Sequence, residues 1–134
     1  GLFGAQVNVT DGRYVYMRGP VDPHNNRPLY NYTVMPTHMR QMFSLQELRT
    51  ATMQQPFAFT KDVPVMKIEA MQPRNRDLVA GVLGTLLFDL QADPKQEHPI
   101  DDPGIEAMMI RHLVRLMKEN DAPPEQFERL GLPR

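Results

Sequence analysis

The sequence predicts an α+β fold: a small antiparallel β-sheet of about four strands packed against a long C-terminal α-helix, plus a short helix. Three observations predict it. Residues 7–17 alternate apolar and polar side chains on either side of Asp11-Gly12, as a β-hairpin does. Residues 85–90 are apolar nearly throughout, which is typical of a buried strand. Residues 103–118 repeat apolar side chains at three- and four-residue steps, which indicates an amphipathic helix.

The N-terminal part is expected to supply three extended segments. Asp11 and Gly12 separate the first two, and both positions accept the positive φ that a type I′ turn requires. Residues 19–28 contain three prolines and an Asn-Asn pair, a composition that favours a connecting loop. Residues 29–36 then indicate a third extended segment, which ends at Pro36.

The middle of the chain predicts one short helix. Ser44 and Glu47 have the spacing of a capping box, in which each side chain satisfies a backbone N–H of the other residue. The helix is expected to run to about Thr50, with Leu45 and Leu48 directed inward. Residues 56–64 are interpreted as a loop, and residues 65–71 as a strand or part of a long excursion. Residues 74–81 are interpreted as a helical turn.

The long C-terminal helix has well-marked boundaries. Asp102 suits the N-cap and Pro103 the first helical position, where its missing N–H costs no hydrogen bond. Glu106 near the start and Lys118 near the end have the charges that the helix dipole favours. This helix is expected to lie across the sheet. Residues 121–134 are expected to form a partly ordered tail, and the whole chain is interpreted as a single domain.

Composition excludes several classes of function. Cysteine is absent, which excludes disulfides, thiolate catalysis and thiolate metal sites within these residues. A net charge of −1 gives no overall basic field, so no nucleic acid is expected as a partner. No apolar run approaches the ~18 residues of a membrane span, so no membrane is expected either. Residues 1–67 are mildly basic, with seven Lys/Arg against four Asp/Glu, and they either form an ordinary solvated surface or face an anionic group.

No catalytic residue and no metal ligand is predicted. The four histidines lack any paired spacing, and the only serine, Ser44, is explained by its capping role. The acidic residues between 89 and 102 are spaced too irregularly for a calcium loop. They are interpreted instead as a connector that begins with the turn at Asp93-Pro94, because Asp bonds the backbone that follows it and Pro fixes φ.

Binding residues are therefore sought in the loops. His38 and Arg40 follow the third extended segment and are the first candidates for contact with an anionic group. His24 and Arg27, in the loop of residues 19–28, are the second pair. For His38 the alternative is a purely local role, in which the ring satisfies nearby backbone groups.

Residues 86–103, LLFDLQADPKQEHPIDDP, resemble the connector near the C-terminus of sulfatases, which joins the last strand of a small C-terminal sheet to the terminal helix. The matching residues are Leu87, Phe88, Asp89, Leu90, Asp93, Pro94 and Glu97. His98-Pro99-Ile100 depart from the Asn-Leu that is usual in the family. The segments FGAQVNVTDGRYVYMRGP (3–20) and PLYNYTVMPTHM (28–39) are also similar to sulfatase segments, in matching order along the chain.

This resemblance implies a sulfatase-like hydrolase of the alkaline phosphatase superfamily, whose members cleave sulfate esters or, in relatives, phosphoesters or phosphonates. The family's nucleophile is a formylglycine made from the Cys or Ser of a C/S-x-P-x-R motif, and a divalent cation, typically calcium, is held by the large α/β domain. Nothing in this sequence matches those motifs, so no cofactor is expected in this chain itself. It begins without Met and is expected to be a fragment, the C-terminal subdomain that packs on the missing N-terminal α/β domain.

The expected role is structural, with a contribution to the rim of the substrate site. On this interpretation His38, Arg40, His24 and Arg27 contact an anionic sulfate-ester substrate, and the chain alone is inactive. A severed subdomain would expose the surface that its partner domain covers and would tend to self-associate. The sequence does not reveal the compartment. The alternative is a stand-alone α+β module for protein interaction or oligomerisation.

Overall fold

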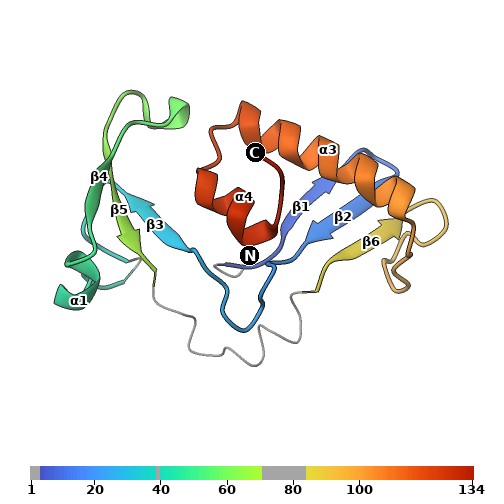
Figure 1. The fold of residues 1–134 in the computed structure, drawn as a ribbon, viewed down its shortest axis with the longest axis horizontal. Helices are drawn as coiled ribbons and strands as arrows, with labels where there is room; N and C mark the ends of the chain where they lie inside the picture. Colours follow the sequence, from blue (N-terminus) through green and yellow to red (C-terminus); the bar gives the residue numbers. More distant parts are fainter. Residues whose placement is uncertain (1–3, 39, 71–83) are drawn as a thin grey trace. The chain divides into compact units, whose positions relative to one another are not determined.

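The computed structural model describes residues 4–38, 40–70 and 84–134 (Figure 1). They form two compact units, which are taken separately below: residues 4–28 with 84–134, and residues 29–70. Each unit contains one three-stranded antiparallel sheet. The predicted α+β class is confirmed, but two sheets of three strands replace the expected sheet of about four. The interpretation of the chain as one domain stays a prediction, and the helical turn expected at 74–81 lies outside the described residues.

The first unit packs two helices on one sheet. Its elements are β1 (Val7–Thr10), β2 (Tyr14–Arg18), β6 (Leu86–Asp89), α3 (Pro103–Glu119) and α4 (Pro124–Leu130). The strands lie in the order β1-β2-β6, and their register aligns Val9 with Tyr16 and Tyr16 with Leu87. These three side chains share one face of the sheet because residues directly opposite each other on neighbouring strands point to the same side. They pack with Met109 and Leu113 of α3 into one buried core, as the prediction of a helix across the sheet requires.

The predicted hairpin is confirmed, but its turn differs from the predicted one. Thr10 pairs with Val15, so the central turn residues are Gly12 and Arg13. Gly12 has φ +97°, whereas Arg13 has no positive φ, and glycine at the first central position is the pattern of a type II′ turn. Asp11 is not a central residue; its carboxylate accepts hydrogen bonds from the backbone N–H groups of Arg13 (2.9 Å) and Tyr14 (2.7 Å). The prediction of a type I′ turn centred on Asp11-Gly12 was therefore wrong, because the turn is centred one residue later, on Gly12-Arg13.

Helix α3 begins where the sequence predicts. Asp102 Oδ1 accepts from the N–H groups of Gly104 (2.9 Å) and Ile105 (3.0 Å), and Pro103 occupies the first turn. Among the described helices, none combines the length and the apolar character that crossing a membrane demands.

The segment 121–134, expected to be a partly ordered tail, contains helix α4 (Pro124–Leu130). Phe127 and Leu130 are buried in the core of the first unit, and Gly131 ends the helix with φ +61°. Arg129, only 3 % exposed, donates to Asn26 Oδ1 (2.9 Å) and to the carbonyl of Gly4 (3.0 Å). Because a buried guanidinium is stable only when hydrogen-bonded, these bonds tie α4 to the N-terminal loops.

The second unit consists of short elements around a small core. They are β3 (Tyr30–Thr33), α1 (Leu45–Leu48), β4 (Thr52–Gln54), the 3₁₀ turn η1 (Ala58–Thr60) and β5 (Val65–Glu69), with strand order β3-β5-β4. Ile68 on the central strand is fully buried. The predicted capping box is confirmed, since Ser44 and Glu47 each bond the other's backbone N–H. The helix is shorter than expected, and Leu45 is 78 % exposed, so its predicted inward direction was wrong.

The Arg129 network leads to a stability prediction. Asn26→Ala removes the acceptor of a buried guanidinium hydrogen bond and should lower the free energy of unfolding by about 2 kcal/mol. Asn25→Ala is the matched control, because this neighbour is exposed and should change stability by less than about 0.5 kcal/mol. Chemical denaturation of the three proteins measures the difference. Equal midpoints for the two variants would mean that the network does not hold α4.

Candidate functional site

A tight turn in the second unit presents Arg40. The backbone N–H of His38 donates to the carbonyl of Gln41 (2.7 Å), and Thr37 and Met42 form an isolated antiparallel bridge on either side. The N–H of Phe43 donates to the carbonyl of Pro36 (3.0 Å), which closes the base of this excursion. The described residues of this excursion, 36–38 and 40–43, are called the Arg40 loop.

The Arg40 loop is fastened to helix α1 through one carboxylate. His38 Nε2 lies 2.8 Å from Glu47 Oε1. Glu47 Oε2 accepts from both the backbone N–H and the hydroxyl of Ser44, each at 2.8 Å. The His38 ring also lies against Phe43, with centroids 4.1 Å apart. Glu47 is only 7 % exposed, so this carboxylate is a buried anchor between the loop and the helix.

The hydrogen bonds determine the protonation of the pair. Bonds from the backbone and hydroxyl of Ser44, and then from His38, hold the pKa of Glu47 below its usual value of 4.5. Glu47 is therefore ionised near neutral pH and can only accept, so the Nε2 of His38 carries the proton that they share. Sequence reasoning placed Glu47 in a capping box but missed its bond to His38. The i, i+3 spacing fixes the first contact, whereas the second spans nine residues and depends on the fold of the loop.

Arg40 has the character of an anion-binding side chain. It is exposed, and among the described residues it has no hydrogen-bond or ion-pair partner. A guanidinium offers five N–H donors in a planar fork that suits the oxygens of sulfate or phosphate groups. The structure therefore brings two of the predicted binding residues together but gives them different parts. Arg40 points to solvent, while His38 serves the local structure.

The second predicted pair lies in the first unit. His24 is exposed, and its backbone N–H donates to Asp22 Oδ1 (2.9 Å) in a turn. Arg27 is exposed in the same loop. Both residues belong to the unit that does not contain the Arg40 loop. The four predicted binding residues therefore lie in two loops, one in each unit. Their contact with one substrate stays a prediction.

The connector after β6 is organised by two aspartates. Asp89 Oδ2 pairs with the Arg13 guanidinium (2.8 Å), which lowers the pKa of Asp89 and joins the connector to the hairpin turn. Asp93 Oδ2 accepts from the N–H of His98 (2.7 Å). Asp93, Glu97 and His98 each offer a possible ligand atom for a metal ion, within 4.8 Å of one another, but the last two are exposed. The turn predicted at Asp93-Pro94 is present, since the N–H of Gln96 donates to the carbonyl of Asp93 (3.1 Å), whereas the bond between Asp89 and Arg13 was not predicted.

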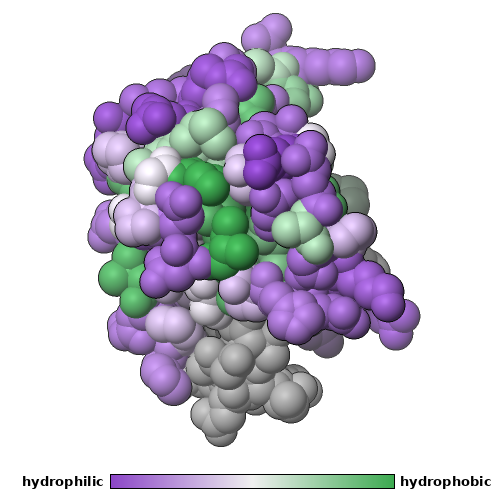
Figure 2. All heavy atoms as spheres, turned by 90° about the vertical axis from the view of Figure 1, so that its right-hand side faces the viewer, coloured by the Kyte–Doolittle hydropathy of each residue, from purple (hydrophilic) through white to green (hydrophobic). Residues whose placement is uncertain are grey.

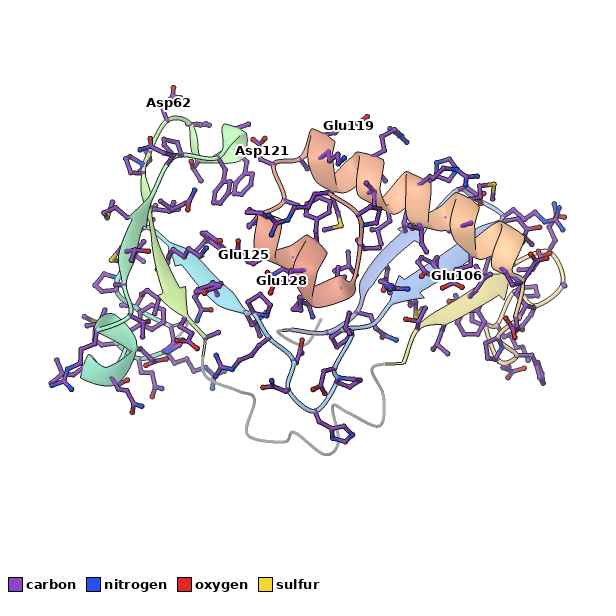
Figure 3. The ribbon with its side chains drawn as sticks, viewed as in Figure 1. Asp62, Glu106, Glu119, Asp121, Glu125 and Glu128 are labelled. Atoms are coloured by element: carbon purple, nitrogen blue, oxygen red, sulfur yellow. The ribbon has the colours of Figure 1, made fainter. Side chains whose placement is uncertain are left out.

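A pocket of about 260 Å³ lies beside the start of α3. It is lined by Tyr16, Thr85, Leu86, Leu87, Ile100, Asp101, Asp102 and Glu106. The hydroxyl of the fully buried Tyr16 donates to Glu106 Oε1 (2.9 Å) and accepts from Arg18 (3.1 Å), so Glu106 joins α3 to the centre of the sheet (Figure 3). On the side of the first unit where β6 and the start of α3 lie, hydrophobic residues form a strip between hydrophilic ones (Figure 2). The described lining offers carboxylates but neither histidine nor serine, so it provides no nucleophile activated by histidine.

A shallow groove follows the C-terminal half of α3. Its volume is about 370 Å³, and its lining is Ile110, Arg111, Val114, Arg115, Lys118, Glu119 and Pro133. Arg115 is paired with Glu119 (2.9 Å). The end of α3, the link that follows it and α4 carry the carboxylates of Glu119, Asp121, Glu125 and Glu128 (Figure 3). Glu125 is buried, so the exposed carboxylates here are those of Glu119, Asp121 and Glu128.

Comparisons with models of protein families, with curated proteins and with solved structures found no match for this chain. Its function is therefore argued from the residues and their geometry.

The Glu47 anchor should show in an acid titration. A carboxyl group whose pKa is lowered by folding stabilises the folded state at pH values above its unfolded pKa of about 4.5. This stabilisation is lost as the pH falls through the lower pKa of the folded state. We expect the Glu47 carboxyl carbon to titrate below pH 4.5 by NMR. A Glu47 carboxyl that titrates at or above 4.5 would contradict the described hydrogen bonds.

Proposed function

We propose that this chain is the C-terminal part of a sulfatase-like hydrolase, a structural and substrate-rim subdomain without the catalytic centre. The observation that carries the proposal is the agreement of sequence and structure over residues 86–103. The stretch that resembles the sulfatase connector joins strand β6, through a turn held by Asp89 and Asp93, to the capped helix α3. A small sheet followed by this connector and a terminal helix is what the resemblance implies.

The chemistry of the proposed enzyme would come from the preceding α/β domain. The formylglycine would supply the nucleophile, and calcium would bind the charge of the sulfate group. This chain offers neither: it has no Cys, and the only Ser, Ser44, is followed by Leu-Gln-Glu-Leu rather than x-P-x-R. No residue of this chain is assigned to hold either group.

The proposed contribution of this chain is recognition by charge. Arg40 stands on an anchored loop with its guanidinium exposed, and it would bind the oxyanion of the substrate at the rim of the site. Because a substrate bound this way keeps the interaction from ground state to transition state, the contact acts chiefly on binding.

The direct test of the proposal uses the full-length protein. Its coding sequence should contain, before Gly1, an α/β domain with a C/S-x-P-x-R motif, and the full-length protein should hydrolyse an aryl sulfate. The chain of residues 1–134, purified alone, should show no turnover. Turnover by the isolated chain, or a full-length protein that lacks the motif, would contradict the proposal.

The role of Arg40 leads to a kinetic prediction. In the full-length protein Arg40→Ala should raise KM for the sulfate ester about tenfold, which corresponds to about 1.4 kcal/mol, and should change kcat less. Arg49→Ala is the control, since Arg49 is an exposed arginine of the same unit, at the end of α1 rather than in the loop. Equal KM values for the two variants and the parent would remove Arg40 from the site.

One observation favours the alternative of a module for protein interaction or oligomerisation. Ten large apolar side chains of the described residues are exposed, and seven of them lie in the second unit: Val34, Met35, Met42, Leu45, Met53, Phe59 and Val63. Exposed methionines form pliable contact surfaces. Sedimentation of the full-length protein separates the two functions, because a subdomain covered by its own α/β domain should not drive dimerisation.

A further inference from the structure

We propose that Glu47 is a positioning residue, whose buried carboxylate fixes the Arg40 loop in the geometry that lets Arg40 bind an oxyanion. The inference rests on the proposed function, in which Arg40 contacts the anionic part of the substrate. Glu47 itself does not touch the substrate in this account. It acts through His38.

Glu47 makes more contacts than its capping role needs. A capping box is complete when one oxygen of the glutamate accepts from the N-cap backbone, and Glu47 Oε2 does this with Ser44 at 2.8 Å. The other oxygen, Oε1, is free of the cap and binds His38 at 2.8 Å. A carboxylate that is 7 % exposed loses much of its hydration, and this second bond replaces part of it. The short helix α1 alone does not explain the burial.

The contacts of His38 hold the turn that contains Arg40. The His38 ring is held by Glu47 on one side and lies against Phe43, which is itself buried. The backbone N–H of the same histidine closes the turn by donating to Gln41. Arg40 stands two residues beyond the held ring, inside that turn. The turn that contains Arg40 is therefore held at His38 by contacts that begin at the buried carboxylate.

Holding the loop in place before binding lowers the entropic cost of binding. A flexible loop must be ordered when it binds, and each immobilised long side chain costs about 0.5–1.5 kcal/mol. Anchoring the loop beforehand removes the backbone share of this cost, so that Arg40 has only its own rotamers to lose. The ligand chemistry that fits is a tetrahedral oxyanion, and both sulfate esters and phosphate esters have it.

A double-mutant cycle in the full-length protein tests the inference. Arg40→Ala, Glu47→Gln and the double variant are compared with the parent, using an aryl sulfate and the matching aryl phosphate. Glu47→Gln keeps the size of the side chain but removes its charge. We expect this variant to raise KM about three- to tenfold with little change in kcat. The double variant should bind no more weakly than Arg40→Ala alone, because Glu47 acts only through that side chain.

The arms of the experiment separate the outcomes. A KM effect confined to the sulfate or to the phosphate identifies the oxyanion that Arg40 binds, and either result supports the positioning role. If the rise in KM in the double variant equals the product of the two single-variant rises, the positioning role is overturned, because Glu47 would then act independently of Arg40. A Glu47→Gln protein with a lower melting temperature but an unchanged KM would also overturn it. Glu97→Gln, an exposed glutamate of the connector, controls for the loss of a charge.

A second measurement does not depend on activity. In isotope-labelled protein the heteronuclear NOE of the Arg40 amide reports backbone order on the picosecond-to-nanosecond timescale. We expect Glu47→Gln to lower it, and Glu97→Gln to leave it unchanged. An unchanged NOE in Glu47→Gln would overturn the positioning role even if the enzyme cleaves sulfate esters. If no ester is hydrolysed, the proposed function fails, and the NOE still decides whether Glu47 holds the loop.

Discussion

A buried charge is stable only when hydrogen bonds replace its lost hydration, and this constraint shapes both units of the structure. In the first unit Arg129 holds the N-terminal loops against α4, and in the second unit Glu47 holds the Arg40 loop against α1. Among the described residues, no buried side-chain nitrogen or oxygen lacks a hydrogen-bond partner. Loops that would otherwise be free to move are thus fixed by the needs of two charged side chains.

The core of the first unit follows the same logic around Tyr16. This side chain lies at the centre of the middle strand and is fully buried beneath α3, so its ring contributes to the apolar core. Its hydroxyl must then find polar partners, which Glu106 and Arg18 supply. Arg18 also donates to the carbonyl of Leu130 (2.8 Å) at the end of α4. A network that starts from one buried hydroxyl thereby joins the sheet to both helices.

Local signals in the sequence predicted the local structure well. The hairpin, the capping box at Ser44 and the start of α3 at Asp102 depend on residues close together in the chain, and all three are confirmed. The features that were missed depend on contacts between distant residues. Arg129 contacts Gly4 across 125 positions, and no periodicity in the sequence indicates that a charged residue will be buried there.

The same distinction applies to the candidate site. His38 and Arg40 were selected from their loop position and charge, which the sequence gives directly. The sequence could not predict that His38 holds the loop while Arg40 is exposed to solvent. This difference depends on the bond between His38 and Glu47 and on the buried position of Glu47. The direction of Leu45 was wrong for a related reason. Helix α1 has only four residues, and it is Glu47 rather than Leu45 that turns inward.

We propose that an arginine held in place by a buried glutamate recognises the substrate, while the reactive groups would lie in another domain of a sulfatase-like hydrolase. A crystal structure of the full-length protein with a bound, unreactive sulfate-ester analogue tests this most directly. We expect a guanidinium nitrogen of Arg40 about 3 Å from a sulfate oxygen, with the His38 ring still hydrogen-bonded to Glu47. A sulfate group bound entirely by other residues, with Arg40 beyond hydrogen-bonding reach, would contradict it.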